Sequence, residues 1–375
     1  MRKTILMSMV ALFVIGCNQK SDEDAIVINP DDAIDVRFED VATDVKIVPL
    51  QSDVPIGGCY YLQCTGNEVM FLDNTYQKVY YFKNGQYQST LNSVGRGAGE
   101  YTSISRICYD PDSKVLYIRA NEQNDAILRY SVQDMKYQGA LKAPYQIESI
   151  NLYDDNTLML ALRNGQEFGV YLYSIETQEI TEKVCDLTVY QGQNASLALG
   201  GCNKKSHLVS LFGTTNQIFN HSDQELEPVL KFNYGDKGVD YIYNARLETA
   251  DDVQAYSDYT NSHGNHYLNL WYPHKDDDGV SFWYSTLSRR TKNYHYFRIN
   301  GDKTVSLKGF NVPGIKKPIF PTCITENGYA TIIEGGKDAI RDTDTPLSSF
   351  GQKIIDALSS QNDDNPIIIY FNIGG

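Results

Sequence analysis

The chain has 375 residues, enough for two or three average domains or for one large propeller or barrel, so length alone leaves the number of domains open. Its formal net charge is −14, and such an acidic surface repels phosphate backbones, so we expect no nucleic-acid partner. Hydrophobic residues make up 42% of the chain and 28 residues are Tyr, which favours a globular all-β protein because aromatic rings suit the half-buried surface of a sheet.

The N-terminus has the layout of a secretory signal. Arg2 and Lys3 precede an apolar run, Ile5–Ile15, that is too short to span a bilayer comfortably. The run ends in Val14-Ile15-Gly16-Cys17, which resembles a bacterial lipobox, and this resemblance implies that Cys17 becomes the acylated first residue. An ordinary signal peptide with a chance cysteine is the alternative. We expect residues 1–17 to be a lipoprotein signal peptide and the lipid to hold the protein at a membrane.

The segment after Cys17 is polar and acidic. Residues 18–24 read NQKSDED, which suits a solvated tether, and we expect residues 18–44 to be a tether and lead-in. The run is also similar to the export signal that sends lipoproteins of some gut anaerobes to the outer face of the outer membrane. Both interpretations stay open, so the predicted location is the outer membrane, either surface-exposed or periplasmic.

The stretch from Met70 to Tyr101 predicts a meander of antiparallel strands. Apolar and aromatic runs at Met70–Asp73 and Lys78–Phe82 flank a polar turn, and a second turn at Asn84-Gly85 leads into a third run. A glycine-rich link, Gly95–Tyr101, follows and leads toward the next unit.

The same plan of strand, polar turn and strand recurs along the chain. Second strands of these units start near residues 68, 115, 158, 207, 266 and 329, a spacing of roughly 40 to 60 residues that is typical of one four-stranded blade per repeat. Third strands are expected at Ala126–Tyr130, Gly169–Tyr173 and Gln217–Asn220, and outer strands near Tyr137–Leu141, Ile180–Leu187 and Pro228–Phe232. Residues 45–375 are therefore predicted to form one all-β, six-bladed β-propeller with short helical insertions.

The repeat also resembles a known family. Leu72-Asp73-Asn74, Val79–Phe82 and Gly95–Tyr101 look like an NHL-type propeller repeat, and the chain from about Val45 to Ile373 is similar to six-bladed β-propeller lipoproteins common in gut anaerobes. The resemblance implies the fold and no agreed activity. We expect the ring to close by pairing Val45–Leu50 with the last blade, which holds Pro366–Phe371, because closure removes two open sheet edges.

Two insertions are expected to decorate a face of the propeller with short helices. In Gly235–Asn265, Thr249 suits an N-cap because acids follow it in the first turn. In Gly335–Asn365, Thr345 and Pro346 suit the N-cap and the first helical position, and apolar residues follow at helical spacing.

The glycine-rich link is the first candidate binding segment. Its glycines let backbone amides approach a ligand, Arg96 could hold a carboxylate or a sugar hydroxyl, and Glu100, next to Tyr101, could act as an acid. The alternative is structural, because a chain that crosses from the outer edge of one blade to the inner strand of the next needs tight turns. No recognisable helix follows, so the link predicts no phosphate loop.

The insertion ahead of the fifth blade is the second candidate binding segment. It concentrates tyrosines among Asn, Asp and His, and rings with polar tips suit sugar faces and protein hot spots alike. The candidate binding residues are Tyr241, Tyr243, Tyr256 and Tyr259. Tyr267, Trp271 and Tyr272 continue the series, and for Tyr267 and Trp271 packing within the blade is the favoured interpretation.

Metal binding and disulfides are both disfavoured. His263 and His266 would point to opposite faces of a strand, and Asp276–Gly279, just after His274, suits a turn better than a calcium loop, so we expect no metal and no cofactor. Cys64, Cys108, Cys202 and Cys323 occupy equivalent places in different repeats. We expect them on different blades, beyond bridging distance, as small buried core residues.

Two functions of different class follow. The favoured one is a non-catalytic module that binds a glycan, a peptide or a partner lipoprotein. The alternative is a hydrolase or lyase with a site at the channel mouth, built from acids expected between second and third strands: Asp73, Glu122, Asp125, Glu167 and Asp276. No Ser-His-Asp, Cys-His or paired-carboxylate pattern stands out, which favours the binding module.

Overall fold

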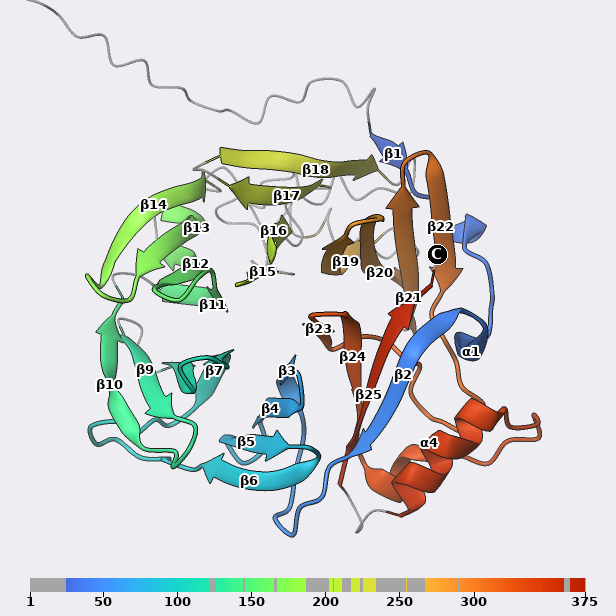
Figure 1. The fold of residues 1–375 in the computed structure, drawn as a ribbon, viewed down its shortest axis with the longest axis horizontal. Helices are drawn as coiled ribbons and strands as arrows, with labels where there is room; N and C mark the ends of the chain where they lie inside the picture. The colour runs from blue at the N-terminus through green and yellow to red at the C-terminus, as the bar shows by residue number, and fades with distance from the viewer. Residues whose placement is uncertain are drawn as a thin grey trace, which may run out of the picture.

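The protein is a six-bladed β-propeller, as predicted from its repeats (Figure 1). The computed structural model describes residues 25–121, 126–143, 146–164, 167–186, 202–204, 206–210, 217–222, 225–233, 254, 267–288, 291–360 and 365–374. Neighbouring strands within each blade are antiparallel, and in blades one to five they follow one another in chain order from the channel to the rim. This local meander is what the alternation of apolar runs and polar turns favours.

The strands of blades one to three are regular and short. Blade one contains β3 (Tyr60–Thr65), β4 (Glu68–Asp73), β5 (Lys78–Lys83) and β6 (Gln86–Leu91). Blade two contains β7 (Ile104–Asp110), β8 (Val115–Ala120), β9 (Ala126–Ser131) and β10 (Tyr137–Lys142). Blade three contains β11 (Gln146–Leu152), β12 (Thr157–Asn164), β13 (Glu167–Ser174) and β14 (Glu179–Asp186).

Blades four to six vary more. Blade four contains β15 (Cys202–Asn203), β16 (Ser206–Ser210), β17 (Gln217–Ser222) and β18 (Glu225–Asn233). Blade five contains β19 (Tyr267–Asp276), β20 (Gly279–Ser288), β21 (Thr291–Asn300) and β22 (Lys303–Lys308). Blade six contains β23 (Cys323–Thr325), β24 (Gly328–Ile333), β25 (Ile367–Ile373) and the N-terminal strand β2 (Ala42–Pro49).

Five of the six predicted starts of second strands are confirmed to within a residue. The fifth is wrong, because the strand that begins near residue 266 is β19, the innermost strand of blade five, and the second strand β20 begins at Gly279. The expected turn at Asp276–Gly279 separates the two. The predicted third and outer strands of blades two to four are confirmed as β9, β10, β13, β14, β17 and β18.

Strand β2 closes the ring, as predicted. It pairs antiparallel with β25, with Lys46 opposite Tyr370 and Val48 opposite Ile368, and the Leu50 amide donates to the Pro366 carbonyl at 3.0 Å. The first and last parts of the chain thus share one sheet, which makes blades one and six neighbours.

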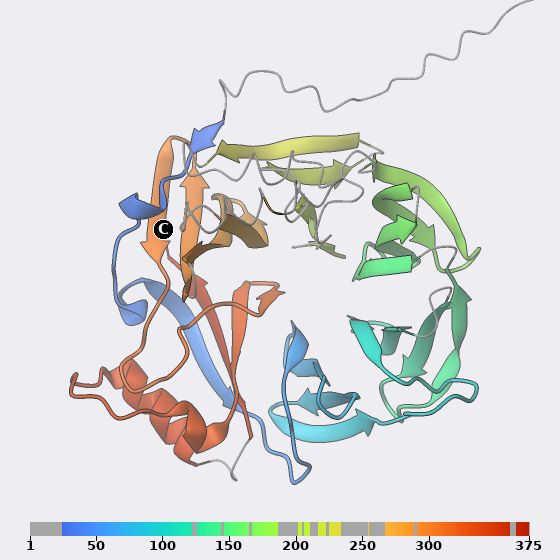
Figure 2. The same ribbon diagram turned by 180° about the vertical axis from the view of Figure 1, so that it is seen from behind.

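The segment before β2 is a strap that runs along the rim of blades four and five (Figure 2). Strand β1 (Ile26–Val27) pairs parallel with β18, a 3-10 helix follows at Pro30–Asp32, and Ile34 forms a parallel bridge to Leu307 of β22. A short helix, α1 (Phe38–Val41), leads into β2. Residues that we expected to be tether and lead-in are therefore packed against the ring from Ile26 onward.

Helix α4 (Ser349–Ser359) decorates blade six, as the second insertion predicts. The predicted N-cap Thr345 is wrong, because the Ser348 side chain accepts from the Gly351 amide at 3.0 Å and the helix begins after it. Phe350, Ile354 and Leu358 are buried in the core of blades five and six. The other predicted helix, after Thr249, lies outside the described residues. None of the described helices has the length and apolar character needed to cross a membrane.

The cysteines whose side chains are described are free. Cys64, Cys108 and Cys323 are buried, as expected. Cys64 and Cys323 nevertheless belong to one core cluster, because closing the ring brings blades one and six together. They are not joined by a disulfide.

Candidate functional site

The innermost strands run in the same direction around the channel, so their starts gather at one end and their ends gather at the other. We call the first the aromatic end, defined by Tyr60, Tyr61 and Arg106. We call the second the ionic end, defined by Glu68, Asp110 and Lys204. The two ends differ in how completely their polar groups are satisfied.

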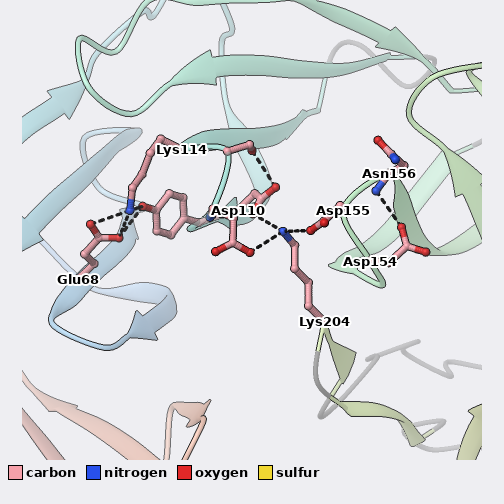
Figure 3. Close-up of polar contacts among 10 residues, drawn as sticks. Glu68, Asp110, Lys114, Asp154, Asp155, Asn156 and Lys204 are labelled. Atoms are coloured by element: carbon pink, nitrogen blue, oxygen red, sulfur yellow. Dashed lines mark hydrogen bonds and ion pairs between the residues drawn. The ribbon is translucent and has the colours of Figure 1, made fainter.

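Lys204 ties three blades together at the ionic end (Figure 3). Its ammonium lies 2.8 Å from Asp110 Oδ1, 2.9 Å from Asp112 Oδ2 and 2.8 Å from Asp155 Oδ1. Burial opposes the charge, but the hydrogen bonds with these carboxylates raise the pKa of Lys204 above its usual value. Burial would raise the pKa of Asp110, but the hydrogen bonds from Lys204, Ser113 and the Asp112 amide have a larger effect and lower it. Both groups are charged at neutral pH.

Glu68 is the centre of a second network at this end. Lys114 Nζ lies 2.9 Å from both carboxylate oxygens, and the hydroxyls of Tyr81 and Tyr109 donate at 2.8 and 2.7 Å. Burial would raise the pKa of Glu68, but the bonds from Tyr109, Lys114 and Tyr81 lower it. A carboxylate that is ionised and saturated in this way cannot act as a general acid at neutral pH. Its role is to hold blades one and two together.

A third polar contact joins blades three and four at the ionic end. His221 is 1% exposed, and its Nε2 lies 2.8 Å from Glu182 Oε1 while its Nδ1 lies 2.9 Å from the Tyr153 hydroxyl. The Tyr153 ring stacks on His207 with centroids 3.9 Å apart. A carboxylate, an imidazole and a hydroxyl that are connected in this order can activate the hydroxyl as a nucleophile. The same contacts also join blades three and four.

The aromatic end leaves large polar side chains open to solvent. Tyr60 is 52% exposed and Tyr61 is 43% exposed. Tyr61 has a φ of 51°, in the left-handed region that is unfavourable for a bulky residue, and the register of β3 against β4 shifts at this point. Arg106 donates to the Tyr61 hydroxyl, and its guanidinium carbon lies 4.9 Å from the centroid of that ring. About half of each ring is therefore open to solvent.

A second arginine lies beside the first. Arg106 and Arg119 are directly opposed in the pairing of β7 with β8, where like charges normally destabilise a sheet. Arg119 is 8% exposed and donates to Ser105 Oγ at 2.7 Å and to Asn121 Oδ1 at 3.0 Å. Burial lowers the pKa of Arg119, Glu148 opposes this, and the positive charge of Arg106 adds to the lowering. Two guanidinium groups lie on opposed residues here, which makes this end suited to an anionic group.

The glycine-rich link is built mainly by its own contacts. Glu100 accepts a hydrogen bond from the Gly97 amide at 2.7 Å, and a Cβ at Gly95 would lie 2.1 Å from a Glu100 oxygen. Gly99 has a φ of 73° and lies under Tyr137, whose ring a Cβ would meet at 2.4 Å. The Tyr130 hydroxyl donates to the Gly99 carbonyl at 2.7 Å. The link therefore fits against the outer strands of blade two, and it needs glycine for that reason.

The predicted binding residues of the link differ in accessibility. Arg96 is exposed, Glu100 is half-buried, and Tyr101 is fully buried in the core between blades one and two. Burial raises the pKa of Tyr101 to about 12. Tyr101 is thus a core residue of the link and offers no surface to a ligand. Tyr241, Tyr243, Tyr256 and Tyr259 lie outside the described residues, as does Cys17.

The acids considered for catalysis that the structure describes, Asp73, Glu167 and Asp276, lie in blades one, three and five. Asp73 is fully buried and accepts from the amides of Thr75, Tyr76 and Gly57, so it shapes a turn. Asp276 follows the first strand of blade five, where it accepts two bonds of 2.8 Å from Arg298, so the expectation that it precedes a third strand is wrong. Glu122 and Asp125 lie outside the described residues. Within the described ranges, no three His, Cys, Asp or Glu side chains are grouped as metal ligands.

Sequence reasoning missed the residues of the aromatic end. Tyr60 and Tyr61 are consecutive at the start of the inner strand β3, so their side chains point to opposite faces of the sheet. Two consecutive tyrosines at this position are the sequence signal that could have identified them. The strained φ of Tyr61 has no counterpart in the sequence.

Comparison with known proteins identifies a family and a fold. The model of a domain of unknown function, DUF4934, matches residues 25–372. A protein from Bacteroides fragilis NCTC 9343 that is named as exported has a similar structure, with a TM-score of 0.63 and 13% identity over 92% of this chain and 98% of that chain. A member of the DUF4221 family from Bacteroides vulgatus ATCC 8482 has a TM-score of 0.56 and 10% identity over 89% and 98%. None of the curated proteins matches the chain.

Proposed function

The chain belongs to the DUF4934 family, and we propose that it is an exported, non-catalytic binding module that takes a glycan, a peptide or a partner lipoprotein at the aromatic end of its channel. The observation that carries this proposal is the pair Tyr61 and Arg106. An exposed aromatic ring is held under a guanidinium group at a β-bulge, and bulges are commonly used to redirect a side chain at a functional site; the positive φ itself also occurs at the bulge of Tyr272.

The chemistry of the aromatic end suits a ligand with flat apolar faces and an acidic group. Tyr60 and Tyr61 present rings that can stack on a sugar or a peptide side chain. Arg106 and Arg119 provide positive charge in an otherwise acidic protein, and a guanidinium binds a carboxylate through two parallel hydrogen bonds. A uronic-acid glycan or an acidic peptide fits this combination.

The candidate residues of the link and the insertion remain proposed contacts of a wider surface. Arg96 is exposed and could contact a large ligand, and Tyr241, Tyr243, Tyr256 and Tyr259 are proposed to do the same. Glu100 and Tyr101 would act indirectly, because they shape the link.

The test uses Tyr61→Gly, Tyr60→Ala and Arg106→Gln in the mature chain. Tyr61→Gly removes the cost of the left-handed backbone conformation, about 1 kcal/mol, but it also removes a contact with Arg106 that contributes a similar free energy. The Tm of this variant should therefore hardly change. Retention in affinity gels that contain neutral or uronic-acid polysaccharides, and binding to peptides selected from a random library, should fall at least tenfold in all three variants. The control is Tyr137→Ala, which removes a partly exposed ring from the rim of blade two.

Retention that survives all three substitutions would place binding elsewhere on the ring. Loss of binding in Tyr137→Ala to the same extent, with an unchanged Tm, would also contradict a site at the aromatic end.

The export and anchoring of the chain are part of the proposal. The Bacteroides fragilis neighbour is named as exported, and the lipobox-like sequence at Cys17 is consistent with a lipoprotein in the outer membrane, surface-exposed or periplasmic. The NHL-like character of the repeat has only the sequence resemblance in its support.

A hydrolase or lyase is the second candidate, and the contact chain of Glu182, His221 and Tyr153 is the observation that favours it. In this alternative, Tyr153 would be the reacting hydroxyl at the ionic end. Tyr153→Phe removes that hydroxyl and keeps the ring stacked on His207, so turnover of chromogenic glycosides and polysaccharide lyase substrates should disappear while the Tm changes little. Absence of turnover by the unaltered protein rejects the alternative.

A further inference from the structure

A groove lies between the closing strand and the helix of blade six. It has a volume of about 500 Å³ and is lined by Val45, Ile47 and Pro49 of β2, by Ser349, Phe350, Lys353 and Ala357 of α4, and by Glu39 of α1. A volume of this size is within the range of pockets that bind small ligands or peptide side chains. Val45 is 37% exposed, so part of the apolar wall faces solvent.

The groove follows the free edge of β2. Leu50 donates its amide to Pro366, and the register pairs Val48 with Ile368 and Lys46 with Tyr370, so the amides of residues 46, 48 and 50 point toward β25. The Ile47 amide and the carbonyls of Val45 and Ile47 therefore point the other way. Among the residues that the structure describes, no other strand pairs with β2. Val45 and Ile47 therefore contribute both unpaired backbone groups and apolar side chains to the groove.

Two outer edges on this rim, those of β18 and β22, are covered by the chain itself. Strand β1 adds to β18 through only two residues, and next to it the Ile28 side chain is 1% exposed in the core between blades four and five. Ile34 adds to β22 through a single bridge. The strap thus shows how strand addition and an inserted aliphatic side chain cover an edge of this ring, where the chain connection and the buried Phe38 also hold the segment.

We propose that the groove between β2 and α4 binds an extended peptide segment of a partner protein by strand addition. The bound segment donates to the carbonyls of Val45 and Ile47, accepts from the Ile47 amide, and inserts one aliphatic side chain beside Ile47, Phe350 and Ala357. The positive φ of Asp44 and the imide of Pro49 limit the free edge to about three residues, so the recognised motif is short.

The rim of the groove adds charge selectivity. Lys353 is exposed at one wall and Glu39 is half-buried at another, and no ion pair of either is found among the described residues. A peptide with an acidic residue next to its inserted aliphatic residue would pair with Lys353. The charge of Lys353 favours a peptide that carries an acidic side chain at this position over a neutral one.

The test has two steps on the mature chain. Hydrogen exchange at single residues should show that the Ile47 amide exchanges at least a hundredfold faster than those of Lys46 and Val48 in the free protein. Peptides are then selected from a phage-displayed random library, with Lys353→Glu protein used for counter-selection, and a selected peptide should slow exchange at Ile47 at least tenfold. Ala357→Trp fills the groove and should abolish binding, whereas Lys303→Glu on the exposed rim of blade five is the matched charge control and should leave it unchanged.

Several outcomes would overturn the proposal. An Ile47 amide that is already protected in dilute free protein shows that the edge is not available. Protection that rises with protein concentration assigns the edge to a second copy of the chain. Selected peptides that bind Ala357→Trp protein equally, or that bind without protecting Ile47, show that the groove is not a site of strand addition.

Discussion

The buried carboxylates of Glu68 and Asp110 at the ionic end accept hydrogen bonds from other blades. Gln63 shows the same principle with a neutral group, since its amide donates to the Ile107 carbonyl at 2.8 Å and accepts from the Tyr109 amide at 2.6 Å in the next blade. Such contacts replace the hydrogen bonds that a continuous sheet would supply between the inner strands of neighbouring blades.

Lys204 is the residue whose loss should matter most at the ionic end. We predict that Lys204→Met destabilises the protein by about 2 kcal/mol, because the buried carboxylate of Asp110 would lose its counter-ion and face two other acids. Urea unfolding measures the loss. The double variant Lys204→Met with Asp110→Asn should recover part of it, and equal stability of the single variant and the parent would contradict the network's role.

His295 should make the stability depend on pH. Burial lowers the pKa of His295 to about 4, and the charge of Lys308 adds to the effect. In the unfolded state this imidazole binds a proton near pH 6.5, whereas in the folded state it stays neutral until about pH 4. The free energy of unfolding should therefore fall by up to about 3 kcal/mol as the pH drops from about 6.5 to about 4. Above about pH 7 the ring is neutral in both states and contributes no pH dependence.

The variant His295→Gln tests this interpretation. Its free energy of unfolding should be less sensitive to pH between about 7 and 5 than that of the parent. Some slope should remain, because burial also lowers the pKa of His274. Identical slopes in variant and parent would show that His295 does not titrate as described.

At the scale of elements, β2 and the strap have separable roles. Strand β2 supplies the fourth strand of blade six, and Leu50 just beyond it is fully buried in the core between blades six and one. The strap before it covers edges that are already part of complete four-stranded blades.

Two deletions should therefore differ. Removing residues 18–52 opens the ring and exposes several aliphatic side chains, and we expect a loss of at least about 5 kcal/mol and a sharply lower Tm. Removing residues 18–37 takes away β1 and the bridge at Ile34 and should lower the Tm only moderately. Differential scanning calorimetry compares the two, and an unchanged Tm after the longer deletion would reject closure by β2.

At the scale of the whole molecule, the strap fixes where a lipid anchor would meet the ring. Ile26 is the first residue paired with a blade, nine positions after Cys17, so an extended tether spans roughly 30 Å. A lipid at Cys17 would therefore keep the rim of blade four within about 30 Å of the membrane.

The proposed anchor is tested in cells. Cys17→Ala should release the protein from the membrane fraction or leave it unprocessed, because firm attachment requires the several acyl chains of a lipoprotein. Protease added to intact cells should digest a surface-exposed protein. A protein that resists protease in intact cells but is digested after lysis lies on the periplasmic side. Membrane association of the Cys17→Ala variant would reject the lipid anchor.

The architecture could be predicted from the sequence. The number of blades, the strands of blades one to four and the helix near Phe350 follow from short-range patterns of apolar and polar residues, which depend on neighbours a few positions away. The pairing of β2 with β25 follows from the need to remove open sheet edges. The boundaries were less certain for the same reason, since Ser348 and Thr345 are both acceptable caps and only packing against blade six selects one of them.

Which side chains meet depends on the tertiary structure. Lys204 and Asp110 are 94 residues apart, and their contact depends on where blades two and four place the ends of their inner strands. The strap, the strained Tyr61, the opposed Arg106 and Arg119, and the free edge of β2 likewise depend on the relative position of elements distant in the chain. Local sequence patterns do not predict the relative position of these elements, because the free energy that fixes it comes from packing the closed ring.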